Sequence, residues 1–139
     1  MEITIDYDKD KDIVIATPVA EINQENIKSG VLETLKIAKQ HRCFYLLLDM
    51  RKCQIGQSLM EGFLTMRNMN QTLGLSYEYK VAVVYNPASY PDDRANFIQT
   101  IVRNRANPPF RMFRELKDAL VWIRELQANA SKNNIKSKS

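Results

Sequence analysis

The chain has 139 residues, with 20 Lys and Arg against 16 Asp and Glu and a formal net charge of +4. This length suits a single domain with one core, and the hydrophobic content of 45% is ordinary for a globular protein. The sequence contains no apolar run close to the roughly 20 residues that span a bilayer, and no secretory signal pattern follows Met1. We therefore expect a cytoplasmic protein without a transmembrane segment.

The surplus of basic residues lies mostly at the end of the chain. Residues 128–139 contain Lys132, Lys136 and Lys138 and no acid, which leaves 17 basic residues against the same 16 acids in residues 1–127. This segment is rich in Asn, Ser and Lys, a composition typical of disorder. We predict one domain over 1–127 and a disordered basic tail over 128–139. Because the domain itself is nearly neutral, the basic net charge of the whole chain is weak evidence for nucleic-acid binding.

The first part of the chain predicts a hairpin, a helix and a buried strand. Apolar residues alternate with polar ones on both sides of the charged segment 8–12, which favours an antiparallel hairpin. Asn23 is a suitable N-cap for a helix that should end near His41. The continuous apolar run 44–48 predicts a strand covered on both faces, and Asp49 ends it.

The second part predicts three more helices and two more strands. Ser58 and Glu61 form a capping box, and Gly74 closes the helix that follows them. The apolar run 81–85 predicts a second buried strand, and Asn86 follows it. A helix with acids in its first turn follows, from near Tyr90 to Asn107. A short strand over 110–113 and a last amphipathic helix, with apolar residues from Leu116 to Ile123, complete the predicted elements. The order ββαβαβαβα predicts an α/β fold with a mixed, mostly parallel five-stranded sheet.

A candidate binding site follows from this topology. In open sheets of this kind, ligands bind beyond the carboxyl ends of the parallel strands. The predicted site contains polar residues after the strands and a methionine whose flexible side chain suits a partner surface. These candidates are Asp49, Gln57, Ser58, Met60, Asn86 and Tyr90.

The sequence gives little support for catalysis. It has no glycine-rich phosphate-binding motif, and its single histidine, His41, falls at a predicted helix end, where a cationic ring is favourable. Cys43 opens a predicted buried strand, and Cys53 has no neighbour that would lower its pKa, so both are expected to be inert thiols. We expect no metal site, no cofactor and no enzymatic activity.

The order of elements resembles STAS-like domains, the family of bacterial anti-sigma-factor antagonists. The resemblance rests on the Leu-Leu-Leu-Asp strand end at Asp49, the loop leading to Ser58, and the segment 110–113 before the helix containing Trp122. It extends to about Leu126 and is closest to the uncharacterised bacterial STAS-like branch. CRAL-TRIO lipid carriers share the general fold.

The resemblance implies a regulatory role and a modification site. In antagonists, a serine at the start of the helix after this strand is phosphorylated, within a motif similar to Asp-Ser-x-Gly. Ser58 occupies that place, but Gln57 precedes it and Met60 stands where the glycine would be. The capping box alone also explains Ser58.

Three functions therefore remain open on the sequence. The first is a regulatory module that binds a protein partner, with a homodimer as one possible assembly. The second is a carrier of a small apolar ligand or lipid, by analogy with CRAL-TRIO proteins. The third, ranked last, is weak nucleic-acid binding through the basic tail and a set of arginines, Arg94, Arg103, Arg105, Arg111 and Arg114.

Overall fold

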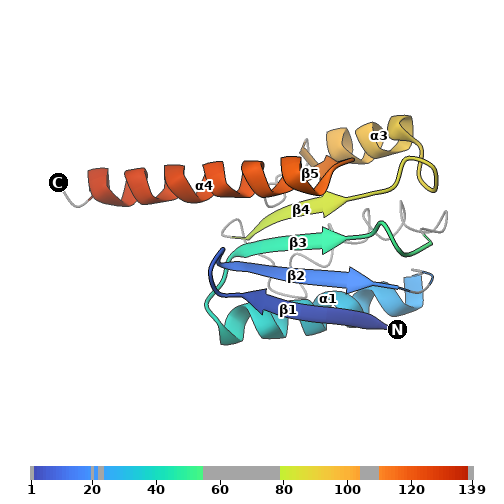
Figure 1. Cartoon of the computed structure of the whole chain (residues 1–139), viewed down its shortest axis with the longest axis horizontal. Coiled ribbons are helices and arrows are strands. Elements are labelled where there is room, and N and C mark those ends of the chain that lie inside the picture. Colours follow the sequence, from blue (N-terminus) through green and yellow to red (C-terminus); the bar gives the residue numbers. More distant parts are fainter. Residues whose placement is uncertain (1, 20, 22–23, 55–78, 104–109, 138–139) are drawn as a thin grey trace.

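Five strands form one sheet in which neighbours in space are also neighbours along the chain (Figure 1). The strands are β1 (Ile3–Asp8), β2 (Ile13–Pro18), β3 (Tyr45–Asp49), β4 (Lys80–Val84) and β5 (Phe110–Phe113). β1 is antiparallel to β2, and the other three pairings are parallel. The computed structural model describes residues 2–19, 21, 24–54, 79–103 and 110–137. The predicted mixed, mostly parallel five-stranded sheet is confirmed.

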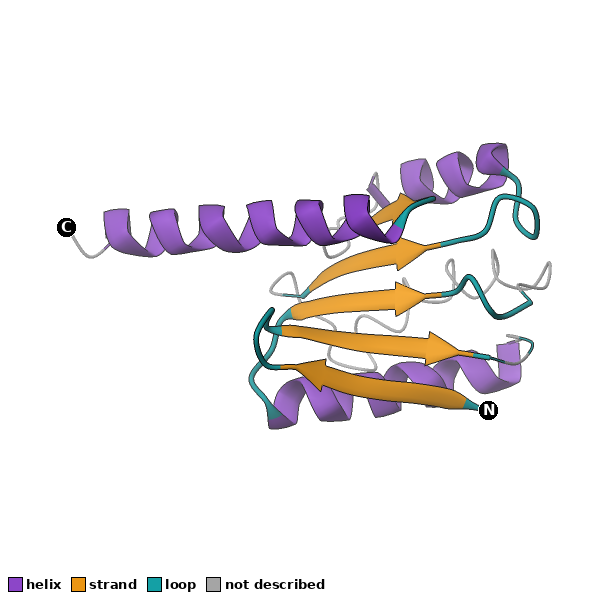
Figure 2. Cartoon of the chain, in the orientation of Figure 1, coloured by secondary structure: helices purple, strands orange, loops and turns teal. Residues whose placement is uncertain are grey.

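Helices cover both faces of this sheet (Figure 2). The described helices are α1 (Gln24–Gln40), α3 (Asp92–Arg103) and α4 (Leu116–Ser137). Buried residues of α1 and α3 belong to one apolar cluster, whereas buried residues of α4 belong to the other. The helix predicted after Ser58 falls within residues 55–78 and lies outside the described residues.

The alternation of side chains along the strands explains these two clusters. Successive residues of a strand point to opposite faces, so Leu46 and Val83 pack on the α1 and α3 side, while Leu47 and Val84 pack on the α4 side. Leu47 is only 1% exposed and Val84 is fully buried. A continuous apolar run is therefore required in these strands, because both faces are covered.

The hairpin turn is fixed by its own carboxylates. The Asp8 Oδ1 atom accepts hydrogen bonds from the backbone N–H groups of Asp10 and Lys11, each at 3.1 Å. Asp12 has a φ of 53°, a left-handed conformation that Asp tolerates better than most residues. The Tyr7 hydroxyl donates to Asp12 Oδ1 at 2.8 Å. The charged segment 8–12 is thus a tight turn, as the alternation on both sides predicted.

The last helix is longer than the sequence predicted. α4 runs to Ser137, and its far part extends beyond the sheet in Figure 1. The Gln127 side chain donates to the backbone oxygens of Lys11 and Asp12 at 2.8 and 3.2 Å, which ties α4 to the hairpin turn. Ala128 and the next three residues are exposed. The turns of α4 continue as far as Ser137 without Gly or Pro. The division into a domain over 1–127 and a disordered basic tail over 128–139 stays a prediction.

Candidate functional site

The parallel register brings three loops to one edge of the sheet. Asp49 lies opposite Val84, and the Met50 N–H donates to the Val84 carbonyl at 2.8 Å. In the same way, the Tyr85 N–H donates to the Phe113 carbonyl at 2.9 Å. Loops after β3, β4 and β5 therefore begin side by side. We call this edge the carboxyl rim, and it comprises residues 49–53, 85–92 and 114–115.

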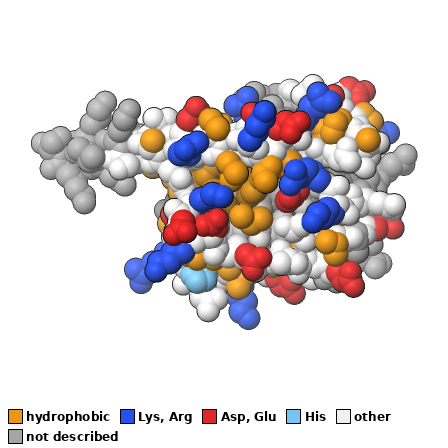
Figure 3. Space-filling view, viewed as in Figure 1, with side chains coloured by type: hydrophobic (Ala, Val, Ile, Leu, Met, Phe, Trp, Pro, Cys, Tyr) orange, Lys and Arg blue, Asp and Glu red, His pale blue; other side chains and the backbone are white. Residues whose placement is uncertain are grey.

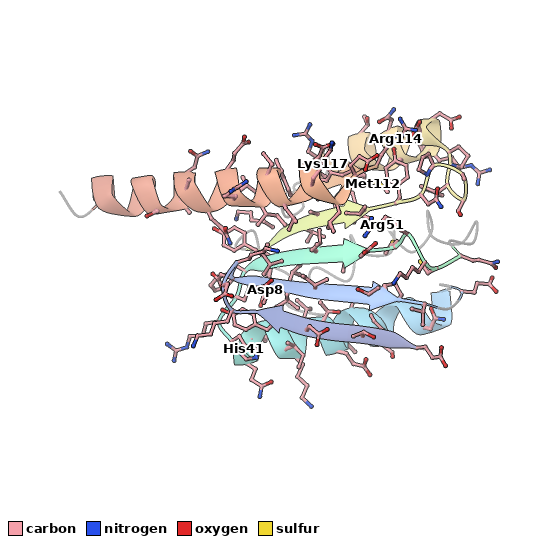
Figure 4. The ribbon with its side chains drawn as sticks, in the orientation of Figure 1. Asp8, His41, Arg51, Met112, Arg114 and Lys117 are labelled. Atoms are coloured by element: carbon pink, nitrogen blue, oxygen red, sulfur yellow. The ribbon has the colours of Figure 1, made fainter. Side chains whose placement is uncertain are left out.

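An ion pair between Asp49 and Arg51 occupies the first loop of the carboxyl rim. Figure 4 labels Arg51 near the end of β3. The Arg51 Nε and Nη2 atoms donate to Asp49 Oδ1 and Oδ2, each at 2.8 Å, so the contact is bidentate. The Arg51 backbone N–H also donates to Asp49 Oδ1 at 3.3 Å. Asp49 thus accepts an amide hydrogen bond from the turn, but its main partner is a guanidinium.

This pairing determines the electrostatics of Asp49. The hydrogen bonds from the Arg51 side chain lower the pKa of the Asp49 carboxyl, and burial raises it by a smaller amount. Asp49 also raises the pKa of Arg51, and the charge of Glu115 adds to that effect. The Asp49 side chain is 12% exposed, whereas the Arg51 side chain is 40% exposed. The guanidinium is therefore the group that meets the solvent.

A second polar contact joins the loops after β4 and β5. The Tyr85 hydroxyl donates to Asp92 Oδ1 at 2.6 Å, and Arg114 Nε lies 3.4 Å from the same oxygen. Asp92 is in the first turn of α3, where a carboxylate is favoured by the helix dipole. Burial and the bond to Asp92 raise the pKa of Tyr85 to about 12. This contact therefore links the end of β4, the first turn of α3 and the loop after β5.

Asn86 and Tyr90, both predicted site residues, occupy different environments. The Asn86 Oδ1 atom accepts a hydrogen bond from the Ala88 N–H at 3.0 Å, and the residue is half-buried. Tyr90 is 4% exposed, and its ring meets that of Tyr85 edge-on at 6.3 Å. Tyr90 therefore packs in the core beneath the carboxyl rim, and its accessible surface is small. The sequence could not reveal this, because the proline after Tyr90 marks a helix start without showing which way the ring points.

The predicted candidates Gln57, Ser58 and Met60 lie outside the described residues, and their roles stay predictions. Arg51 is a rim residue that sequence reasoning missed. The sequence feature that could have identified Arg51 is its position, two residues after the aspartate that ends a buried strand. Arg114 was considered only for nucleic-acid binding, whereas here it contacts Asp92.

The two cysteines are buried thiols. Burial is the main cause that raises the pKa of Cys43 and of Cys53, each to about 11. The Cys53 thiol also donates to the Met50 carbonyl at 3.2 Å. The raised pKa values favour the protonated thiol at both positions near neutral pH.

Two further features lie away from the carboxyl rim. The His41 ring stacks on the Tyr7 ring, with 4.2 Å between centroids, at the opposite end of the sheet (Figure 4). A groove of about 380 Å³ lies between α4 and the hairpin turn. Its lining residues are Asp10, Lys11, Ile13, Leu120, Arg124 and Gln127. Of the arginines considered for nucleic acid, Arg111 lies over the Phe113 ring at 5.1 Å.

Over the described part of the chain, no cluster of three or more His, Cys, Asp or Glu side chains is suited to hold a metal ion. In the same residues, no helix has the length and apolar character needed to cross a membrane.

Comparison with known proteins gives likenesses in structure. No protein-family profile matches the chain, and no curated protein matches it in sequence. An anti-sigma factor antagonist from Mycobacterium paratuberculosis matches with a TM-score of 0.57 and 15% identity, over 88% of this chain and 95% of that one. An uncharacterised DUF3478-family protein with a SpoIIAA-like fold, from Shewanella loihica, matches with a TM-score of 0.55 and 16% identity, over 88% and 92% of the two chains. At these identities the likeness establishes the fold.

Proposed function

We propose that this STAS-like domain is a non-enzymatic regulatory module that binds a protein partner through its carboxyl rim. The observation that carries the proposal is the convergence of three loops at one edge, held there by the register of β3, β4 and β5. A solved structure of the same fold is named an anti-sigma factor antagonist. Its name supports a protein partner as the class of ligand.

The polar groups of the carboxyl rim favour recognition over catalysis. Asp49 is paired with Arg51, and Asp92 is held by Tyr85 and Arg114. Catalytic acids and bases need pKa values close to the working pH. Here the pKa of Asp49 is lowered and that of Tyr85 is raised to about 12, so both move away from neutrality.

The exposed cations of the carboxyl rim are the expected contacts. The side chains of Arg51 and Arg114 are 40% and 61% exposed, and each is held by a carboxylate of its own chain. An arginine oriented in this way loses less side-chain entropy on binding than a free one. The proposed surface also includes Asn86 and the untested candidates Gln57, Ser58 and Met60, with Ser58 as a phosphorylation site. We place this function in the cytoplasm.

The test is affinity capture from cells that naturally express the protein. The bait proteins are the wild type, Arg51→Glu and Arg124→Glu, each analysed by quantitative mass spectrometry. Arg124 is an exposed arginine on α4 at the groove, so its variant has the same charge change away from the carboxyl rim. We expect one or more proteins to be lost only from the Arg51→Glu capture. Equal recovery on all three baits would contradict the proposal.

A second candidate function is the binding of a small apolar ligand. The observation in its favour is the groove beside α4, where Ile13 and Leu120 provide apolar lining. Its volume of about 380 Å³ is within the range of small-molecule sites. Native mass spectrometry of protein purified from its own cells tests this function. A bound small molecule that Leu120→Asn removes would support it, and an unloaded mass in the wild type would end it.

A further inference from the structure

The first strand is an open edge of the sheet, and its free backbone groups can be assigned. Among the strands that the structure describes, β1 pairs with β2 alone. The Val19 N–H donates to the Glu2 carbonyl at 3.1 Å, so these opposed residues form a hydrogen-bonded pair of the antiparallel ladder. Hydrogen-bonded pairs alternate with non-hydrogen-bonded pairs along an antiparallel ladder. Thr4 and Asp6 therefore also turn their backbone N–H and C=O groups toward β2. Ile3↔Pro18 is then a non-bonded pair, which suits a proline without an N–H.

The backbone groups of three residues therefore face outward from the edge. They are the N–H and C=O groups of Ile3, Ile5 and Tyr7, and no strand of the described residues pairs with them. β1 contains no proline or glycine, and its register with β2 is unbroken over all six residues. It therefore offers a regular template for one more strand.

The two faces of this edge differ in chemistry. Ile5 and Tyr7 pack against the apolar cluster on the α1 side, where both are partly buried. Glu2, Thr4 and Asp6 are exposed on the opposite face, and red acidic side chains appear along the β1 side of the molecule in Figure 3. Within the described residues neither Glu2 nor Asp6 has an ion pair.

We propose that β1 binds an extended segment of another protein as a sixth, antiparallel strand, in which apolar and basic residues alternate. The backbone of the segment bonds to Ile3, Ile5 and Tyr7. Its apolar side chains then lie on the α1 face beside Ile5, and its Lys or Arg side chains lie opposite Glu2 and Asp6. In strand addition, backbone bonds provide affinity and alternate side chains provide specificity.

A second copy of the chain is a poor match for this edge. In an antiparallel pair of two β1 strands, Glu2 and Asp6 of both copies lie on the same face of the joined sheet. Like charges on neighbouring strands repel each other. We therefore assign the edge to an extended segment of another protein that carries basic side chains on this face.

The test uses a short capped peptide in which Val and Lys alternate, observed by NMR with the full chain labelled. We expect amide shifts and slower hydrogen exchange at Ile3, Ile5 and Tyr7. Two N-methylated versions separate strand addition from charge attraction, because both keep every side chain. Methylation of the Val amides, which face β1, should abolish binding, whereas methylation of the Lys amides should preserve it.

Two variants test the charge complementarity. Asp6→Lys should weaken binding about tenfold, because it replaces an attractive cross-strand pair with a repulsive one. Glu125→Lys has the same charge change on exposed α4 and should bind as the wild type does. The proposal is overturned if the peptide does not bind, if the two methylated peptides bind alike, or if the two variants weaken binding equally.

Discussion

Among the residues of the carboxyl rim, Arg51 combines a structural role with the recognition role that we propose for it. Its guanidinium satisfies both oxygens of Asp49 and still reaches solvent. An aspartate that is 9% exposed at the end of a buried strand needs a partner of this kind, since an unpaired buried carboxylate is costly. The pair therefore stabilises the first rim loop while presenting a cation.

Removal of Arg51 should lower stability in a pH-dependent way. The folded-state pKa of Asp49 is lowered, so its ionised form stabilises the fold above the ordinary aspartate pKa of about 3.9. That contribution is lost as the pH falls through the lower folded-state value. We expect Arg51→Ala to cost about 1 kcal/mol at neutral pH, and less at about pH 3. Urea unfolding at the two pH values measures both.

The matched control for this prediction is Lys52→Ala, the loss of an adjacent exposed cation that makes no ion pair within the described residues. It should change stability less than Arg51→Ala at neutral pH. An Arg51→Ala cost that stays constant from neutral to acid pH would contradict the role given to the ion pair.

Tyr85 and Tyr90 provide a comparison of two buried phenols. Both are about equally exposed, at 5% and 4%, but only Tyr85 donates to Asp92 among the bonds of the described residues. Tyr85→Phe should lower the free energy of unfolding by about 1 to 2 kcal/mol, because it leaves Asp92 without its shortest bond. Tyr90→Phe should cost less. Thermal unfolding of the two variants measures the difference, and equal losses would show that the bond to Asp92 adds no stability.

At the scale of elements, α4 stabilises one face of the sheet, where it packs on β3 and β4, the strands that end at Asp49 and Val84. Ile123 is fully buried in the cluster with Leu47 and Val84, whereas Val121, two residues earlier, is 43% exposed. Ile123→Ala should cost about 2 to 5 kcal/mol by creating a cavity. Val121→Ala should change stability by less than about 0.5 kcal/mol. Chemical denaturation of both variants tests whether α4 turns Ile123 toward the sheet and Val121 toward solvent. Similar losses of unfolding free energy in the two variants would show that it does not.

The elements were predictable from sequence where patterns are local. The runs around Leu46 and Val83 indicated strands covered on both faces, and the alternation around Ile5 indicated the hairpin, because strand geometry imposes these periods directly. The end of α4 was less predictable. Its last turns contain Asn and Ser, which are weak helix formers, so composition favoured a tail, whereas the structure continues the helix to Ser137.

The carboxyl rim was predictable in position but only partly in chemistry. Parallel pairing of β3, β4 and β5 places Asp49 and Asn86 near one edge, and topology alone gave that result. The guanidinium of Arg51 on Asp49 and the contact of Arg114 with Asp92 depend on side-chain conformations in loops. Local spacing does not determine those conformations. Tyr90 shows the same limit, since its ring packs inward.

At the scale of the whole molecule, the two proposed partner surfaces lie at different places. The carboxyl rim is built by the parallel half of the sheet, and the open edge belongs to the antiparallel strand β1. Figure 1 shows β1 at one side of the sheet and the ends of the parallel strands along another. The two proposals together predict that the chain can bind two partners at once, so a variant at one surface should leave binding at the other unaffected.

The most direct test of the carboxyl rim is site-specific photo-crosslinking in cells that naturally express the protein. A photoreactive residue replaces Asn86, which is half-buried at the rim, or Glu125, which is exposed on α4. We predict a discrete protein adduct from position 86 that position 125 does not give, and its loss when Arg51→Glu is added. Adducts from position 125 alone, or none from position 86, would contradict partner binding through the carboxyl rim.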